Sequence, residues 1–186
     1  MSEVISFLRS ESEKQEKLLE ELLNLELNCK GEIVTEKLIE VLQHTYELYS
    51  VTEELRESYP DWVLVDSNRI YDLIKSLIAL KSLPEPSKIT SFPKLAGKGM
   101  IVGYLYVFHL FQVHLHGLFH LLNSQVNMDS SVHRVFGSVN EDLSIRREFI
   151  AKVRTELSMD HKRDLAVGVN SAYADIRNIL TRKSSI

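Results

Sequence analysis

The chain has 186 residues, of which 44% are hydrophobic and 26% are charged, with one cysteine, Cys29. This is the composition of one ordinary globular domain, so it excludes disordered, collagen-like and disulfide-rich proteins. The formal net charge of -4 argues against nucleic-acid binding, because a phosphate backbone favours a basic protein face. We expect a single domain over residues 1–186 in the cytoplasm, since the first residues lack a secretory signal pattern.

The first sixty residues predict two helices. Residues 2–27 place leucines along one side, although residues 9–17 are almost wholly polar. Gly31 is a helix stop, and Pro60 follows a second helix predicted over residues 32–58. These sixty residues hold 14 acidic and 6 basic side chains, a net charge of -8, whereas residues 61–186 hold 12 acidic and 16 basic ones. Such asymmetry orients neighbouring helices or guides self-association, although it is also typical of solvated helix faces.

The centre of the chain holds a connection, a helix and a long break. Trp62 opens a short apolar connection, in which we expect it to close one end of the bundle, and a third helix is predicted over residues 66–80. Residues 83–99 contain three of the four prolines and two glycines, which predicts a crossover loop.

The last ninety residues are again helical in pattern, and they complete an all-α fold. Helices are expected over residues 100–124, 129–136, 140–157 and 158–180, and a frayed C-terminus over 182–186. The sequence therefore predicts an antiparallel helical bundle of five to seven helices, packed around the apolar helix at 100–124.

Thirty consecutive residues, 99–128, carry no charged side chain. The helix inside this stretch is long enough to span a membrane, but it carries four histidines and a glutamine. One isolated membrane span could not provide hydrogen-bond partners for these polar side chains in lipid. We therefore expect a buried helix of a soluble protein and no membrane span.

Polar side chains on this helix form one narrow stripe at 100° per residue. The members of this polar stripe are Tyr106, His109, Gln112, His116, His120, Asn123 and Asn127. Three interpretations stay open: a surface facing solvent or a subunit boundary, a buried network or homodimer seam, and a metal or haem site.

The metal interpretation depends on His116 and His120, whose spacing of four can place two imidazoles on one ion. A third ligand must come from another helix, and His44, which Glu40 and Glu47 flank, is the candidate. The histidine set His44, His116 and His120 is therefore the predicted metal site, although the pattern around His44 is more typical of a charged outer helix face.

No catalytic motif occurs elsewhere, so we expect a non-enzymatic protein that acts through protein–protein contact, as a homo-oligomer or with a protein partner. The alternative is a sensor or metalloenzyme that binds a metal, haem or small ligand through the central histidines, and no cofactor is implied otherwise. A further hypothesis is an apolar-ligand site lined by Tyr104, Phe108, Phe111 and Phe119. The competing interpretation is that these aromatic side chains are ordinary core residues. The basic residues from Arg146 to Arg154 are interrupted by Glu148 and do not predict nucleic-acid binding.

Overall fold

The computed structural model describes residues 2–23, 31–63, 75–76, 79, 94–125, 130, 134 and 143–183. In these residues it contains six α-helices and one short 3₁₀-helix, which confirms the predicted all-α fold. The helices are α1 (Glu3–Glu13), α2 (Lys17–Leu23), α3 (Gly31–Ser58), α5 (Lys98–Gln125), α7 (Leu143–Glu156) and α8 (Lys162–Lys183), with the 3₁₀-helix η1 (Met159–His161) before α8. Apart from residues 75–76, 79, 130 and 134, the predicted helices at 66–80 and 129–136 lie outside the described residues, as do residues 83–93 of the crossover loop.

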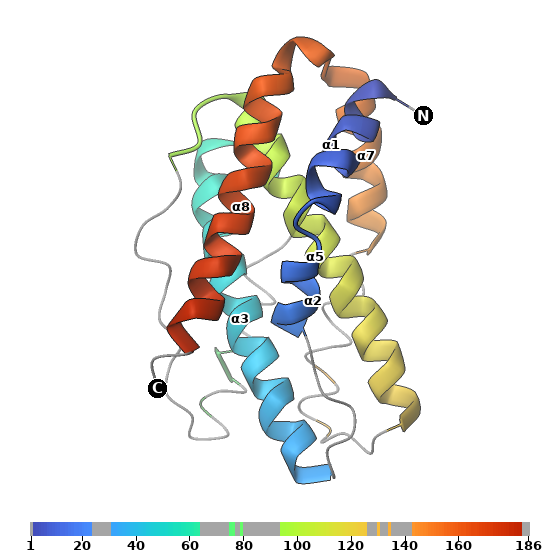
Figure 1. Ribbon diagram of the computed structural model, residues 1–186, viewed down its shortest axis with the longest axis vertical. Helices are drawn as coiled ribbons and strands as arrows, with labels where there is room; N and C mark the ends of the chain where they lie inside the picture. The colour runs from blue at the N-terminus through green and yellow to red at the C-terminus, as the bar shows by residue number, and fades with distance from the viewer. Residues whose placement is uncertain are drawn as a thin grey trace.

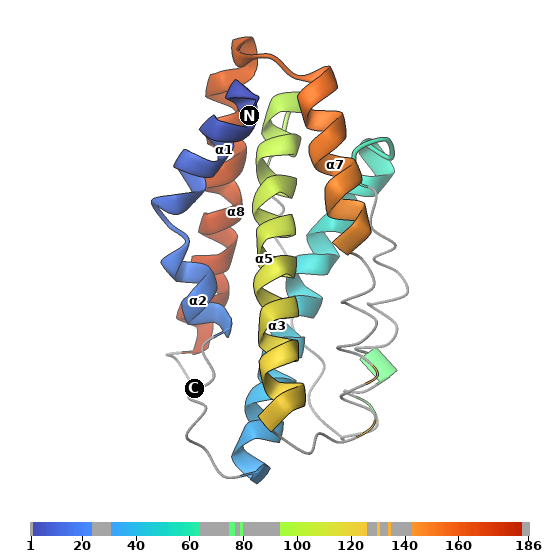
Figure 2. The same ribbon diagram turned by 90° about the vertical axis from the view of Figure 1, so that its right-hand side faces the viewer.

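The uncharged helix α5 is the centre of the bundle and contacts each of the other five α-helices in the described part of the chain. Figure 2 shows α5 between α1 and α2 on one side and α7 on the other, with α8 behind. Residues 101–109 of α5 are all buried, because their side chains pack on every side. No helix in the described ranges is long and apolar enough to cross a membrane.

The most extensive helix contact joins α5 to α8, and these two helices run parallel (Figure 1). The prediction of antiparallel neighbours holds for α3 and α7, which run opposite to α5. The reason lies in the connectivity: α7 carries the chain back to the end where α5 begins, so α8 sets out in the same direction as α5.

Two glycines allow α5 and α8 to approach each other closely. A Cβ atom built on Gly168 of α8 would lie 1.9 Å from the carbonyl oxygen of Met100, and one on Gly103 of α5 would lie 2.2 Å from that of Leu165. Only glycine fits at such a backbone-to-backbone contact. Beside it, the Tyr104 hydroxyl donates a 2.9 Å hydrogen bond to Oδ2 of Asp175, and both residues are buried.

The helix predicted over residues 2–27 is interrupted at residues 14–16, which form a turn between α1 and α2. Polar contacts to α8 accompany the break: the Tyr173 hydroxyl donates to the Ser12 carbonyl oxygen at 3.3 Å, and Gln15 Nε2 donates to Asn170 Oδ1 at 2.8 Å. Arg177 also donates to Gln15. At this break, Gln15 and the Ser12 carbonyl oxygen thus form hydrogen bonds with α8.

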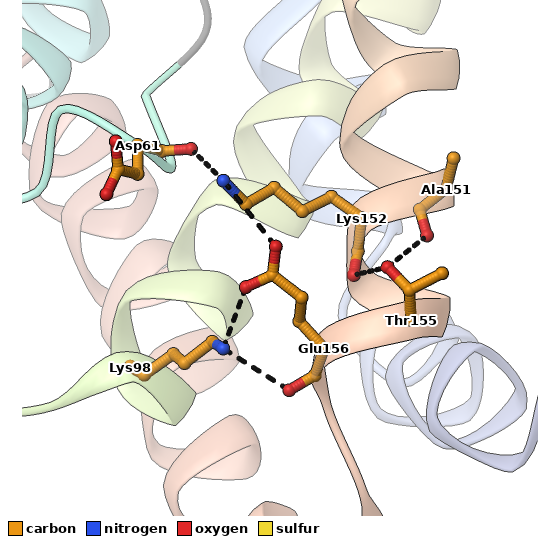
Figure 3. Close-up of polar contacts among 6 residues, drawn as sticks. All are labelled: Asp61, Lys98, Ala151, Lys152, Thr155 and Glu156. Carbon is orange, nitrogen blue, oxygen red and sulfur yellow. Dashed lines mark hydrogen bonds and ion pairs between the residues drawn. The ribbon is translucent and has the colours of Figure 1, made fainter.

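Trp62 closes the end of the bundle where α3 and α7 end and α5 begins, as predicted. Its side chain is buried and packs edge-on against Phe149, and the ammonium groups of Lys98 and Lys152 each lie 4.9 Å from its ring centroid. Figure 3 shows both lysines reaching Glu156, at 3.0 and 3.8 Å, and Lys152 also donating to the Asp61 carbonyl oxygen at 2.6 Å. This lysine–tryptophan cluster ties the ends of three helices together.

Candidate functional site: an arginine cleft beside the central helix

The upper half of the polar stripe is buried inside a single chain. Tyr106, His109 and Gln112 are 5%, 1% and 2% exposed. His109 Nδ1 lies 2.8 Å from Gln112 Oε1, and Gln112 Nε2 donates to the Tyr49 hydroxyl on α3 at 3.0 Å. His109 and Gln112 therefore belong to an internal network that links α5 to α3.

His109 is a neutral imidazole in this network. Because the Gln112 oxygen can only accept, the proton must be on Nδ1. Burial lowers the pKa of His109 to about 4, against the opposing effect of the Gln112 hydrogen bond and with a smaller lowering by Arg146. Its ring lies 4.5 Å from that of Phe149 on α7, and Nε2 has no hydrogen-bond partner in the described structure.

The lower half of the stripe is only partly described. His116 is half-buried, whereas the His120 and Asn123 side chains and all of Asn127 lie outside the described residues. His44 is buried on α3, and Glu47, three residues later, is buried too. Since the position of His120 is not described, the metal site at His44, His116 and His120 stays a prediction; no three candidate ligands come together among the side chains that are described.

The apolar site proposed for the aromatics of α5 is a small cavity. Tyr104, Phe108 and Phe111 line it together with residues of α3 and α8, but it encloses only about 10 Å³, which is room for about one water molecule. Phe108 packs edge-on against Tyr49 at 4.9 Å. In this structure the three aromatics are core residues.

A larger opening lies between α1 and α7, with α5 as its floor. It encloses about 420 Å³, which is within the range of small-ligand sites in proteins. We call it the arginine cleft; it is lined by Ile5, Arg9, Ser12, Glu13, Glu16, Tyr106, Leu110, Arg146, Ile150 and Arg154. In Figure 2, α1 and α7 flank α5 on opposite sides. Most of the residues that line the cleft come from these three helices.

The two walls of the cleft differ in charge. On α1, Arg9 pairs with Glu13 at 2.7 Å; in the turn that follows α1, Glu16 Oε1 lies 3.0 Å from His114 Nε2. On α7, Arg146 and Arg154 form no ion pair with any residue in the described ranges. Among the described residues, the α7 wall thus carries two positive charges without an ion-pair partner, whereas on the opposite wall Glu13 is paired with Arg9 and Glu16 contacts His114.

The floor and sides are mixed in polarity. Ile5, Leu110 and Ile150 supply apolar surface from three helices. Burial raises the pKa of the Tyr106 hydroxyl, whereas Arg146 and Arg9 lower it and Glu16 and Glu13 raise it. Tyr106 therefore stays protonated at neutral pH and lies in the field of the charges from both walls.

Tyr106 was predicted from the sequence as part of the polar stripe, whereas the arginines that surround it were not predicted. The usable signal was the spacing of Arg146, Ile150 and Arg154, which recur every four residues and so share one face of α7. The residues from α1 follow the same rule, from Ile5 through Arg9 to Glu13.

Comparison with known proteins finds no match to this chain, whether among protein families, curated proteins or solved structures.

Proposed function

We propose that the chain is a non-enzymatic protein that acts through contact with a protein partner, and that the arginine cleft receives an acidic segment of that partner. The observation that carries the proposal is the pair Arg146 and Arg154, which border one cleft without counter-charges from the described residues. A guanidinium group binds a carboxylate through two parallel hydrogen bonds, which makes arginine well suited to this recognition.

The exposure of the cleft favours a partner side chain presented from outside. Arg9, Glu13 and Arg154 on its rim are exposed, whereas Tyr106 at its floor is buried. A free small ligand is usually enclosed over most of its surface, and the open rim of this cleft does not provide such an enclosure.

The segment over residues 1–60 has a net charge of -8 and could supply an acidic segment from another copy of the chain. A second copy of this chain is therefore the first partner to examine.

Isothermal titration with a hexaglutamate peptide tests the proposal. We expect the peptide to bind the wild-type protein, more weakly as salt is raised, and to lose at least tenfold in affinity in the double variant R146Q/R154Q. The control R147Q/R163Q removes the same charge from exposed positions of α7 and α8 outside the cleft, and it should bind like the wild type.

Equal binding by both double variants, or no binding by the wild type, would refute the proposed site. Light scattering on the same samples identifies the partner further. Association of wild-type copies that only R146Q/R154Q abolishes would show that a second copy supplies the acidic segment.

A further inference from the structure

We infer that the arginine cleft selects a carboxylate next to an apolar side chain, and that it discriminates against a phosphorylated residue. This inference rests on the proposed function of the cleft and adds the chemistry of its ligand. Three features carry it: the arginines on one wall, which form no ion pair with the described residues, the carboxylates on the other wall, and the apolar surface between them.

The positive wall sets where the charged group binds. Arg146 and Arg154 lie two helical turns apart on the same side of α7, with Ile150 between them. A carboxylate held by either guanidinium therefore lies beside the Ile150 side chain. The ligand group that follows it meets Ile150, Leu110 and Ile5, so an apolar side chain next to the acid gains contact area.

The opposite wall limits the charge that the cleft accepts. Glu13 and Glu16 line it, and they contact Arg9 at 2.7 Å and His114 at 3.0 Å. A carboxylate brings one negative charge, whereas a phosphorylated residue brings close to two at neutral pH. The added charge would face the two glutamates across the cleft, and like charges at short range in a partly buried site repel each other.

Four acetylated and amidated tetrapeptides test the inference by isothermal titration. The reference is Gly-Glu-Leu-Gly; the others replace Glu with Gln, Glu with phosphoserine, or Leu with Ser. We expect the reference to bind at least tenfold more tightly than the Gln peptide, and severalfold more tightly than either the Ser peptide or the phosphoserine peptide.

The variant E13Q tests the physical cause of the selectivity. Removing this carboxylate should improve binding of the phosphoserine peptide by a larger factor than binding of the reference peptide. E11Q is the matched control, because Glu11 lies on the same helix and is also ion-paired, with Lys14, but does not line the cleft. It should leave the ratio of the two affinities unchanged.

The outcomes separate this inference from the proposed function. Binding of the phosphoserine peptide by the wild type that is as tight as or tighter than binding of the reference peptide, or an unchanged affinity ratio in E13Q, overturns the selectivity while an acidic-segment site remains. Equal affinity for the Glu and Gln peptides overturns both.

Discussion

Replacing Gly168 with alanine tests the close contact between α5 and α8 that holds the centre of the bundle. The new Cβ atom would lie 1.9 Å from the Met100 carbonyl oxygen and 2.9 Å from the Tyr104 backbone nitrogen. Ordinary contact begins at 3.4 Å, so the carbonyl oxygen must move away by at least 1.5 Å, the difference between the two distances. Both atoms belong to the α5 backbone, and no side-chain rotation can relieve the overlap.

The expected cost follows from two opposing effects. Overpacking a well-packed interior costs about 1–3 kcal/mol and sometimes more, and a backbone-to-backbone clash belongs at the upper end. Alanine is also a better helix former than glycine by about 1 kcal/mol. We therefore expect Gly168→Ala to lower the free energy of unfolding by about 2 kcal/mol or more.

Urea unfolding, followed by far-ultraviolet circular dichroism, measures this change. Gly117→Ala on α5 is the matched control, because Gly117 is exposed and its added Cβ would meet nothing within 4 Å. It should raise the free energy of unfolding by about 0.5–1 kcal/mol through helix propensity alone. A Gly168→Ala protein as stable as the wild type, or a Gly117→Ala protein destabilised to the same degree, would refute the reasoning.

Three further predictions concern other buried groups. Because the pKa of His109 falls from 6.5 to about 4 on folding, the unfolded chain takes up a proton before the folded chain does as the pH is lowered. The free energy of unfolding should therefore fall by about 3 kcal/mol between pH 6.5 and 4. Urea unfolding at both pH values should show a markedly smaller fall in the variant His109→Leu. Trp62→Ala should cost about 3–5 kcal/mol by loss of its buried ring, whereas Lys98→Gln should cost less than about 1 kcal/mol because its ion pair is partly exposed; equal losses in thermal unfolding would contradict this difference. Tyr104→Phe removes a hydrogen bond to the buried Asp175 carboxyl and should cost about 2 kcal/mol; an unchanged melting curve would show that this bond contributes nothing.

The helices of the described chain were largely predictable from the sequence, because hydrophobic periodicity reports the buried face of a helix directly. The central position of the helix predicted at 100–124 followed from its lack of charge. The break between α1 and α2 was not predicted, since it depends on contacts of Ser12 and Gln15 with residues more than 150 positions away. The parallel course of α8 relative to α5 was likewise set by the path of α7, which no local pattern reports.

The candidate site was less accessible to sequence reasoning. The spacing of His109 and Gln112 correctly placed them on one stripe, but periodicity alone could not show which neighbour covers that stripe. Tyr49 of α3, which accepts the hydrogen bond from Gln112, has a sequence pattern that predicts only an ordinary aromatic core residue. The arginine cleft was missed because its two walls come from α1 and α7, so its charges converge only after the helices have packed.

Methyl NMR of the isotope-labelled protein, titrated with the Gly-Glu-Leu-Gly peptide, tests the claim that the arginine cleft is the recognition site most directly. The methyl groups of Ile5, Leu110 and Ile150 line the cleft, whereas those of Leu165 and Ile176 are buried elsewhere, on α8. We predict saturable shifts of the three cleft residues and none at the two residues of α8. Saturable shifts confined to other parts of the molecule, with the cleft methyl groups unmoved, would contradict the claim.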